Sequence, residues 1–177
     1  MTRNLYVIDL GRCTGCRTCA IACRDRAHGG DGFAWLRVET TEAGQYPHVR
    51  VTHRVVHCFH CSQAPCIDAC PAEALVRDAW GLVKVIGEHC VRCGACVEAC
   101  PFGAITLADQ GPATKCDGCA DELAQGWEPT CVRACPMRAL QYVEEQAWAL
   151  PPRRVMDEAF DGHAAGPAVR YLRRPEG

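Results

Sequence analysis

The sequence contains no long apolar run. Nowhere in its 177 residues does a stretch approach the roughly 18 apolar residues that are needed to cross a bilayer. No Sec or twin-arginine signal follows Met1, so we expect the chain by itself to stay in the cytoplasm. We therefore predict a soluble protein, or one held at a membrane only through another subunit, with no direct membrane insertion.

Nucleotide-binding motifs are absent as well. The sequence has neither a G-x-G-x-x-G fingerprint nor a Walker A lysine loop to bind a nicotinamide, a flavin or a nucleotide. Its charge is nearly balanced, with 19 Lys and Arg against 21 Asp and Glu and a formal net charge of −2. The three arginines within Arg170–Arg174 do not make a basic face in a net-acidic chain, so we expect no nucleic acid partner.

Cysteine, by contrast, is abundant. It supplies 16 of the 177 residues, about 9%, a level that indicates disulfides in a short secreted chain. Disulfides are nevertheless the weaker interpretation here, because no signal peptide precedes Cys13 and disulfide frameworks do not repeat one spacing. The cysteines form four runs: run one is Cys13, Cys16, Cys19 and Cys23; run two is Cys58, Cys61, Cys66 and Cys70; run three is Cys90, Cys93, Cys96 and Cys100; run four is Cys116, Cys119, Cys131 and Cys135.

Run three, which precedes Pro101, has the C-x2-C-x2-C-x3-C-P spacing of bacterial ferredoxins. Its first three thiols lie along one tight loop and can hold three corners of a [4Fe–4S] cube. Cys100 lies one helical turn beyond Cys96, so it suits a neighbouring cluster better than the cluster of its own loop. Zinc is the alternative, but a tetrahedral ion takes two cysteine pairs, whereas run three crowds three thiols into seven residues.

An internal repeat links three of the runs. The segments Cys66–Leu75, Cys96–Ile105 and Cys131–Leu140 match almost letter by letter, and each has Cys-Pro at its centre. Run one departs from this repeat, because Arg24 follows Cys23 where the other runs have proline. A ferredoxin run implies a partner run, so the repeat predicts that clusters come in pairs.

The remaining patterns predict short elements only. In the first third we expect a strand at Leu5–Leu10, a helix after Cys19 that ends at Gly29–Gly30, and strands at Trp35–Thr40 and His48–Val56. The last two form a hairpin or two loosely paired strands, which serve as a docking surface or are an ordinary surface hairpin. Residues 58–108 predict one α+β unit, with short helices after Cys66 and Cys96 and strands at Glu73–Val76, Leu82–Ile86 and Gly103–Leu107.

The end of the chain differs from the repeats. Between Cys119 and Cys131 we expect a helical turn at Ala120–Gln125, followed by Trp127 in a core position near the clusters. After Tyr142 we expect a short helix at Glu144–Leu150 and then an extended arm that lies across another surface or frays.

Several residues beside the cysteines could have roles of their own. His57 and His60 flank Cys58, but run two already supplies four thiols, so we expect packing or hydrogen bonding from these histidines rather than iron ligation. Seven basic residues near the runs either tune cluster potentials or are solvated surface charges. They are Arg12, Arg17, Arg24, Arg92, Lys115, Arg133 and Arg138.

The sixteen-cysteine pattern over residues 4–143 resembles the four-cluster iron–sulfur (beta) subunit of the dimethyl sulfoxide reductase family, whose relatives serve molybdenum and tungsten oxidoreductases. The segments that carry the resemblance are Ile8–Cys19, Cys58–Pro71 and Lys115–Cys119. It implies an α+β fold of tandem, pseudo-symmetric bacterial-ferredoxin-like modules with an inserted hairpin and an extended C-terminal arm. The four-cluster domain would span 1–143, with 58–108 as one two-cluster unit and 4–57 plus 109–143 as the other, and 144–177 would form the arm.

The resemblance also implies that runs one and four exchange cysteines, and that runs two and three do the same. Each of the four resulting sites would hold one [4Fe–4S] cluster. The implied ligands are Cys13, Cys16, Cys19 and Cys135 for site A; Cys23, Cys116, Cys119 and Cys131 for site B; Cys58, Cys61, Cys66 and Cys100 for site C; and Cys70, Cys90, Cys93 and Cys96 for site D.

Two classes of function follow from these patterns. The resemblance implies a non-catalytic subunit that relays electrons between a molybdopterin-containing catalytic subunit, with molybdenum or tungsten, and another redox partner. A membrane-anchor subunit or a flavin or NAD subunit would complete such a complex, and a free-standing polyferredoxin is the alternative within this class. An iron–sulfur enzyme would need an iron with an open coordination position, and sixteen thiols for four cubes leave none.

The resemblance adds two alternatives to the cytoplasmic location. Relatives of this subunit can be exported already folded, together with a catalytic partner that carries the signal. A periplasmic location by such co-export, or association with a membrane through an anchor subunit, is therefore also consistent with the sequence.

Cofactor content tests this interpretation directly. If all 16 cysteines are ligands, anaerobically purified protein should contain about sixteen iron and about sixteen acid-labile sulfide per chain, with a brown absorbance that bleaches on reduction. Elemental analysis and sulfide assay measure both. Stoichiometric zinc without sulfide would contradict the cluster interpretation.

Overall fold

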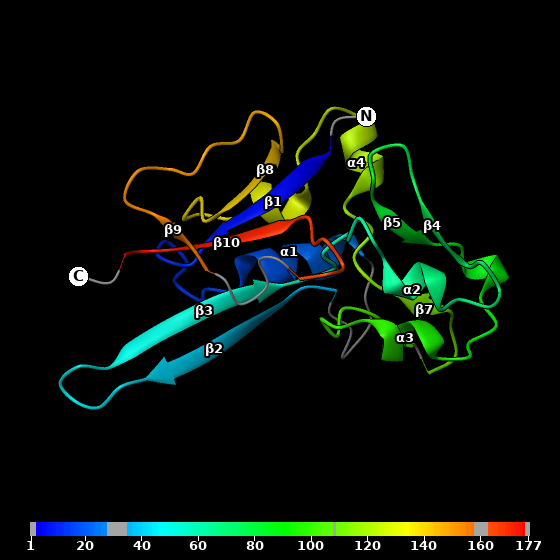
Figure 1. Cartoon of the computed structure of the whole chain (residues 1–177), viewed down its shortest axis with the longest axis horizontal. Coiled ribbons are helices and arrows are strands. Elements are labelled where there is room, and N and C mark those ends of the chain that lie inside the picture. The colour runs from blue at the N-terminus through cyan, green and yellow to red at the C-terminus, as the bar shows by residue number, and fades with distance from the viewer. Residues whose placement is uncertain (1–2, 28–34, 108, 158–162, 176–177) are drawn as a thin grey trace.

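The computed structural model of the chain describes residues 3–27, 35–107, 109–157 and 163–175 (Figure 1). Within these ranges the helices are short, and none is long and apolar enough to span a membrane. They are α1 (Thr18–Arg26), α2 (Pro65–Asp68), α3 (Ala95–Ala99), α4 (Ala120–Ala124), α5 (Thr130–Arg133) and the 3-10 turn η1 (Gly87–His89).

The strands form several small sheets. They are β1 (Asn4–Asp9), β2 (Arg37–Ala43), β3 (Arg50–Val56), β4 (Leu75–Arg77), β5 (Val83–Val85), β6 (Thr106–Leu107), β7 (Ala113–Thr114), β8 (Leu140–Glu144), β9 (Val155–Met156) and β10 (Val169–Arg173). The largest sheet has the order β8-β1-β10-β9, and β2-β3, β4-β5 and β6-β7 are antiparallel pairs. The expected mixture of short helices and small sheets is confirmed.

Strand β1 lies in the middle of the largest sheet. It pairs antiparallel with β8 and parallel with β10, so neither of its edges is free. Leu5 and Val7 pack on one face with Leu172, while Tyr6 and Ile8 enter the main core on the other. Burial on both faces explains why β1 is a continuous apolar run rather than an alternating one.

The main core is built around the cysteines. The buried side chains that pack together with Tyr6 and Ile8 also include seven thiols. These are Cys19, Cys23, Cys61, Cys66, Cys96, Cys131 and Cys135. Groups bound by these thiols would therefore form part of the interior.

The C-terminal segment is where the structure departs most from the sequence prediction. Residues 169–173 do not fray or lie on another surface; they form β10, in which Val169, Tyr171 and Leu172 are buried. The Tyr171 hydroxyl donates to the Val55 carbonyl oxygen at 2.6 Å. The prediction of a peripheral arm is wrong here because the empty edge of β1 can only be satisfied by a strand that arrives from far along the chain.

The prediction of a short helix at the start of this segment is also wrong. No helix forms at 144–150: Glu144 ends β8, and residues 145–147 make a turn. Residues 165–168 run beside the loop of run two, where the amides of Ser62 and Gln63 donate to the carbonyls of Gly166 and Ala165 at 2.9 Å. The arm is thus fastened to the centre of the chain.

The predicted hairpin is present. Strands β2 and β3 pair over their full length, from Arg37 opposite Val56 to Ala43 opposite Arg50. Figure 1 shows this hairpin projecting away from the rest of the chain, and Tyr46 at its tip is 92% exposed. The helix predicted after Cys19 is confirmed as α1, which ends at Arg26. The expected helix end at Gly29–Gly30 lies outside the described residues.

Removing β10 should destabilise the protein strongly. Truncation after Pro167 would expose the β1 edge and remove four buried side chains, of which the three large ones, Val169, Tyr171 and Leu172, are each worth about 1.5–3 kcal/mol. We expect a lower unfolding temperature in the iron-loaded chain, measured by circular dichroism and by loss of cluster absorbance. The control, which removes only 175–177, should unfold like the full chain. Equal unfolding temperatures for the two truncations would contradict this role for β10.

Candidate metal centres

All sixteen cysteines lie in the described part of the chain, and all are free thiols. The structure gathers them around recesses rather than joining them as disulfides. Within the described residues, no three His, Cys, Asp or Glu side chains converge closely enough to hold a single metal ion. At sites A, C and D the thiols instead line recesses that are partly open to solvent, a geometry that suits a multi-atom cluster.

The recess at site C is lined by Cys58, Cys61, Cys66 and Cys100 and has a volume of about 320 Å³, part of it open to solvent. Its first three thiols come from the loop and helix of run two. The fourth, Cys100, directly follows α3 in run three. Helices α2 and α3 pack against each other, which brings the two runs together.

Two further recesses follow the same rule. The recess at site D, about 280 Å³, is lined by Cys70, Cys90, Cys93 and Cys96. The recess at site A, about 300 Å³, is lined by Cys13, Cys16, Cys19 and Cys135. In both, one thiol arrives from a different run, and for site A that contact depends on the packing of α1 against α5.

Site B is deeply buried, and its thiols influence one another electrostatically. Burial, together with the charge of the neighbouring Cys119 thiolate, raises the pKa of Cys23 to about 12. Burial also raises the pKa of Cys131 well above its usual value, with Cys119 and Cys23 as the largest charges. The pKa of Cys116 is raised in the same direction by burial, Cys58, Cys23 and Cys131. Each of these three thiols is thus influenced by the charge of at least one other thiol of site B.

The raised pKa values mean that these thiols prefer to be protonated unless a cation compensates their charge. A buried thiolate is stabilised by a metal ion or by hydrogen-bond donors. A [4Fe–4S] core supplies iron cations to four thiolates at once, so the donor set fits that group. When bound, such a cluster accepts or donates electrons reversibly at potentials that its surroundings tune.

The internal repeat has a structural explanation. In runs two, three and four, the amide of the fourth residue after the last cysteine donates to that cysteine's sulfur. The pairs are Ala74 to Cys70 at 3.2 Å, Ala104 to Cys100 at 3.4 Å and Ala139 to Cys135 at 3.3 Å. Each alanine follows a residue in the left-handed region, namely Glu73, Gly103 or Arg138. The repeated letters thus encode one turn that aims an N–H at a ligand sulfur.

Run one lacks this turn. Cys23 lies inside α1, whose last residue is Arg26, so the chain continues as helix where the other runs turn. The Cys23 thiol is therefore presented from a helix face and is buried. The missing proline after Cys23 indicates this difference in the sequence.

Close packing also constrains the loops that precede the helices. Gly118 has a φ of +72°, and a Cβ there would lie 2.7 Å from the Leu82 side chain. Gly15 has a φ of +70°, and a Cβ there would lie 2.6 Å from the His53 ring of β3. The run-one and run-four loops therefore need glycine both for their conformation and for the neighbour packed against them.

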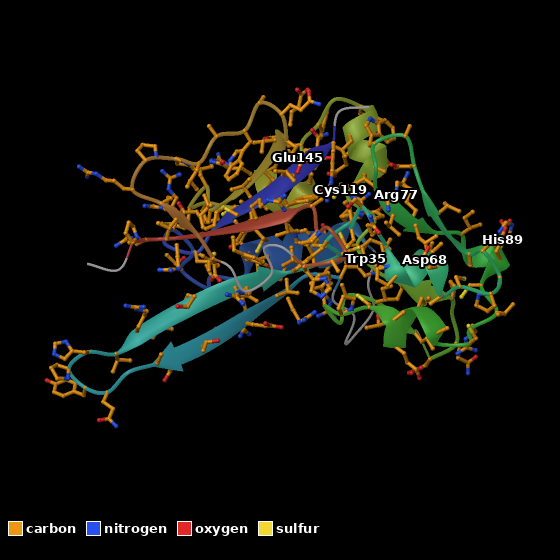
Figure 2. The ribbon with its side chains drawn as sticks, viewed as in Figure 1. Trp35, Asp68, Arg77, His89, Cys119 and Glu145 are labelled. Carbon is orange, nitrogen blue, oxygen red and sulfur yellow. The ribbon has the colours of Figure 1, made fainter. Side chains whose placement is uncertain are left out.

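The four sites differ in exposure. Cys16 of site A and Cys93 of site D are exposed, whereas all four thiols of site B are buried. Site C lies between these extremes, with only Cys100 partly exposed. Figure 2 shows Cys119 within the body of the molecule and His89, which precedes Cys90, at its far edge.

His57 and His60 pack as the sequence predicts. Both are buried against Tyr6, with ring centroids 4.6 and 6.3 Å away. His57 Nδ1 lies 2.7 Å from the Cys58 carbonyl oxygen, and His60 Nδ1 accepts from the Val83 amide at 3.0 Å. Burial lowers the pKa of His57 to about 4 and that of His60 well below its usual value, so both imidazoles are neutral at physiological pH.

The prediction of a core position for Trp127 is wrong. Its side chain is 56% exposed and lies under the Arg133 guanidinium, which is 4.8 Å from the ring centroid. Residues 126–128 are all exposed and carry the chain over the surface toward α5, so the ring meets solvent instead of the core.

Arg26 was not indicated by any sequence pattern, yet it fastens three elements around site B. Its guanidinium donates two hydrogen bonds to the Asp117 carboxylate, at 3.0 and 3.1 Å, and also contacts Asp121. Glu122 in α4 accepts in turn from Thr130 and Arg133 of α5. This network joins the helix of Cys23 to the segments that carry the other three thiols of site B.

Known proteins resemble this chain along its length. Residues 49–145 match the 4Fe-4S dicluster domain, and residues 10–26 match a 4Fe-4S binding domain. The chain is 32% identical over 201 residues to YnfG of Escherichia coli (strain K12), a probable anaerobic dimethyl sulfoxide reductase subunit, covering 99% of this chain and 98% of the relative.

Two further relatives cover most of the chain. The identity is 35% over 150 residues to the B subunit of anaerobic dimethyl sulfoxide reductase from the same strain, covering 80% of this chain and 73% of the relative. The identity is 39% over 145 residues to the thiosulfate reductase electron transfer subunit PhsB of Salmonella typhi, covering 78% of this chain and 76% of the relative.

Replacing Arg26 should impair site B selectively. Arg26→Met leaves Asp117 and Asp121 without the cation they pair with, beside negatively charged thiolates, and lost hydrogen bonds to charged groups cost about 1.5–3 kcal/mol. We expect iron to fall from about sixteen to about twelve per chain. Arg12→Met, on an exposed arginine near site A, is the control and should keep its iron. A fully loaded Arg26→Met protein would contradict this role.

Proposed function

This chain belongs to the 4Fe-4S dicluster family, which includes electron-transfer subunits of dimethyl sulfoxide and thiosulfate reductases, and on that premise we propose that it is the electron-transfer subunit of a molybdenum- or tungsten-containing oxidoreductase. The family that the sixteen-cysteine pattern predicts is confirmed. The chain is an iron–sulfur protein that relays electrons, and it is not itself the catalytic subunit.

We propose four [4Fe–4S] clusters, one at each of sites A to D. The observation that carries this proposal is the recess lined by Cys58, Cys61, Cys66 and Cys100, in which a thiol of run three completes a set from run two. The recesses at sites A and D support the same exchange of ligands. At site B the support is the mutual influence of the thiol charges.

The exposure of the thiols suggests an order for the relay. Sites A and D, with Cys16 and Cys93 at the surface, would exchange electrons with partners, and sites B and C would connect them through the interior. The packing of α1 on α5 and of α2 on α3 supports two modules, 58–108 and 4–57 plus 109–143. In this view residues 144–177 are a closing segment of the second module, since β10 pairs with β1.

The chain's own groups prepare the sites for electron transfer. Buried thiols keep water away from the sulfurs, and amides such as those of Ala74 and Ala139 donate to them, which favours the charged thiolate form. The rigid loops hold the ligands in one geometry, so little reorganisation accompanies a change of charge. An anchor, flavin or NAD subunit and the compartment stay predictions from the sequence.

The partner can be tested by purification. An affinity-tagged chain, isolated anaerobically from its native host, should bring with it a polypeptide that contains molybdopterin and molybdenum or tungsten, detected by metal analysis. Isolation of the chain with four clusters but without such a polypeptide would favour the free-standing polyferredoxin instead.

The exchanged ligation can be tested by two matched substitutions. Cys100→Ser should strip or convert the cluster at site C, and Cys70→Ser should do the same at site D, because each thiol serves the neighbouring loop. Electron paramagnetic resonance and iron analysis would identify the altered cluster. Either variant should also block electron flow to the catalytic partner, while a dye that bypasses this chain still supports that partner's activity. An intact four-iron cluster on Cys58, Cys61 and Cys66 in Cys100→Ser would contradict the assignment.

A further inference from the structure

Lys115 is the one buried member of the seven basic residues beside the cysteine runs. The other six are exposed, whereas Lys115 is only 3% exposed. Its ammonium donates to the Cys116 carbonyl oxygen at 2.9 Å and to the Val83 carbonyl oxygen. In the described part of the chain no carboxylate forms an ion pair with it.

The two carbonyl partners place this ammonium between the two inner sites. Cys116 belongs to site B, and Val83 lines the recess of site C. The amide of Val83 is held by His60 Nδ1 at 3.0 Å, so the residue that accepts from Lys115 is fixed from both sides. Tyr6 packs beside His57 and His60, and its hydroxyl donates to the Gly118 carbonyl oxygen at 3.2 Å.

A buried ammonium needs negative charge nearby. Two carbonyl oxygens satisfy its hydrogen bonds in part, but the desolvation of an ion without a counter-charge is still unfavourable. A [4Fe–4S] core with four thiolates carries about two negative charges, and one more after reduction. Clusters at sites B and C would supply the counter-charge that the described carboxylates do not.

We propose that Lys115 is the shared counter-cation of sites B and C, and that its charge raises the reduction potentials of the two inner clusters. A positive charge stabilises the reduced, more negative form of a cluster, and net charge near a cluster is a determinant of its potential. The inference rests on the proposed function only in requiring clusters at these two sites. Lys115 thereby sets the reduction potentials of the two clusters, at sites B and C, between which an electron passes from one module to the other.

The test is a potentiometric titration of the iron-loaded full chain, followed by electron paramagnetic resonance. In Lys115→Met, two of the four midpoint potentials should shift downward and the other two should remain as in wild type, with iron content unchanged. Lys115→Arg keeps the charge and should keep all four potentials near wild type. Lys84→Met is the matched control, because Lys84 lies on β5 but pairs with Asp78 at 2.8 Å and is partly exposed.

Each outcome decides between a charge requirement and a merely structural one. Four unchanged potentials in a fully loaded Lys115→Met protein would overturn the proposal. If Lys115→Met loses iron, the iron contents of Lys115→Gln and Lys115→Arg are compared with it. Iron loss in both neutral variants, with iron retained in Lys115→Arg, supports a requirement for the positive charge. Equal iron loss in all three variants overturns the proposal. Wild-type protein with fewer than four clusters, or without a catalytic partner, would instead contradict the proposed function, so the two failures are distinguishable.

Discussion

The convergence of sulfur ligands from distant segments is the constraint on which the structure depends. In each recess three thiols come from one run and the fourth from another, as Cys100 does at site C. The chain can satisfy this only if helices from different runs pack together, as α1 does on α5 and α2 on α3. Because the ligands are also core residues, ligand geometry and core packing are one requirement rather than two.

Burial of so many thiols creates an electrostatic problem that the backbone partly solves. The pKa of Cys61 is raised to about 12, first by burial and then by Cys58 and Cys100, which shows how unfavourable the thiolates are on their own. Amide donors at Cys70, Cys100 and Cys135 offset part of this. Iron would offset most of it, so binding of metal and folding of the interior are expected to be coupled.

The sheet around β1 packs one face into the main core, where Tyr6 meets His57 and His60 of the second run. Its parallel partner β10 is the last strand of the chain, and the connection to it passes the loop of run two through Ser62 and Gln63. This path links both ends of the chain to the middle. A protein whose ordinary apolar core is small gains stability from such long-range closure as well as from its cofactors.

The sequence by itself determined the cysteine runs, the β1 strand and the β2–β3 hairpin, because spacing and apolar patterning are local and survive without knowledge of the fold. Only the tertiary structure decided that 169–173 would become β10, that Trp127 would meet solvent, that Arg26 would join three elements, and that Lys115 would be the buried cation. These outcomes depend on which segments meet. A tail with two or three apolar residues looks the same whether it frays or fills an open strand edge, and a lysine beside a cysteine looks the same at the surface as between two sites.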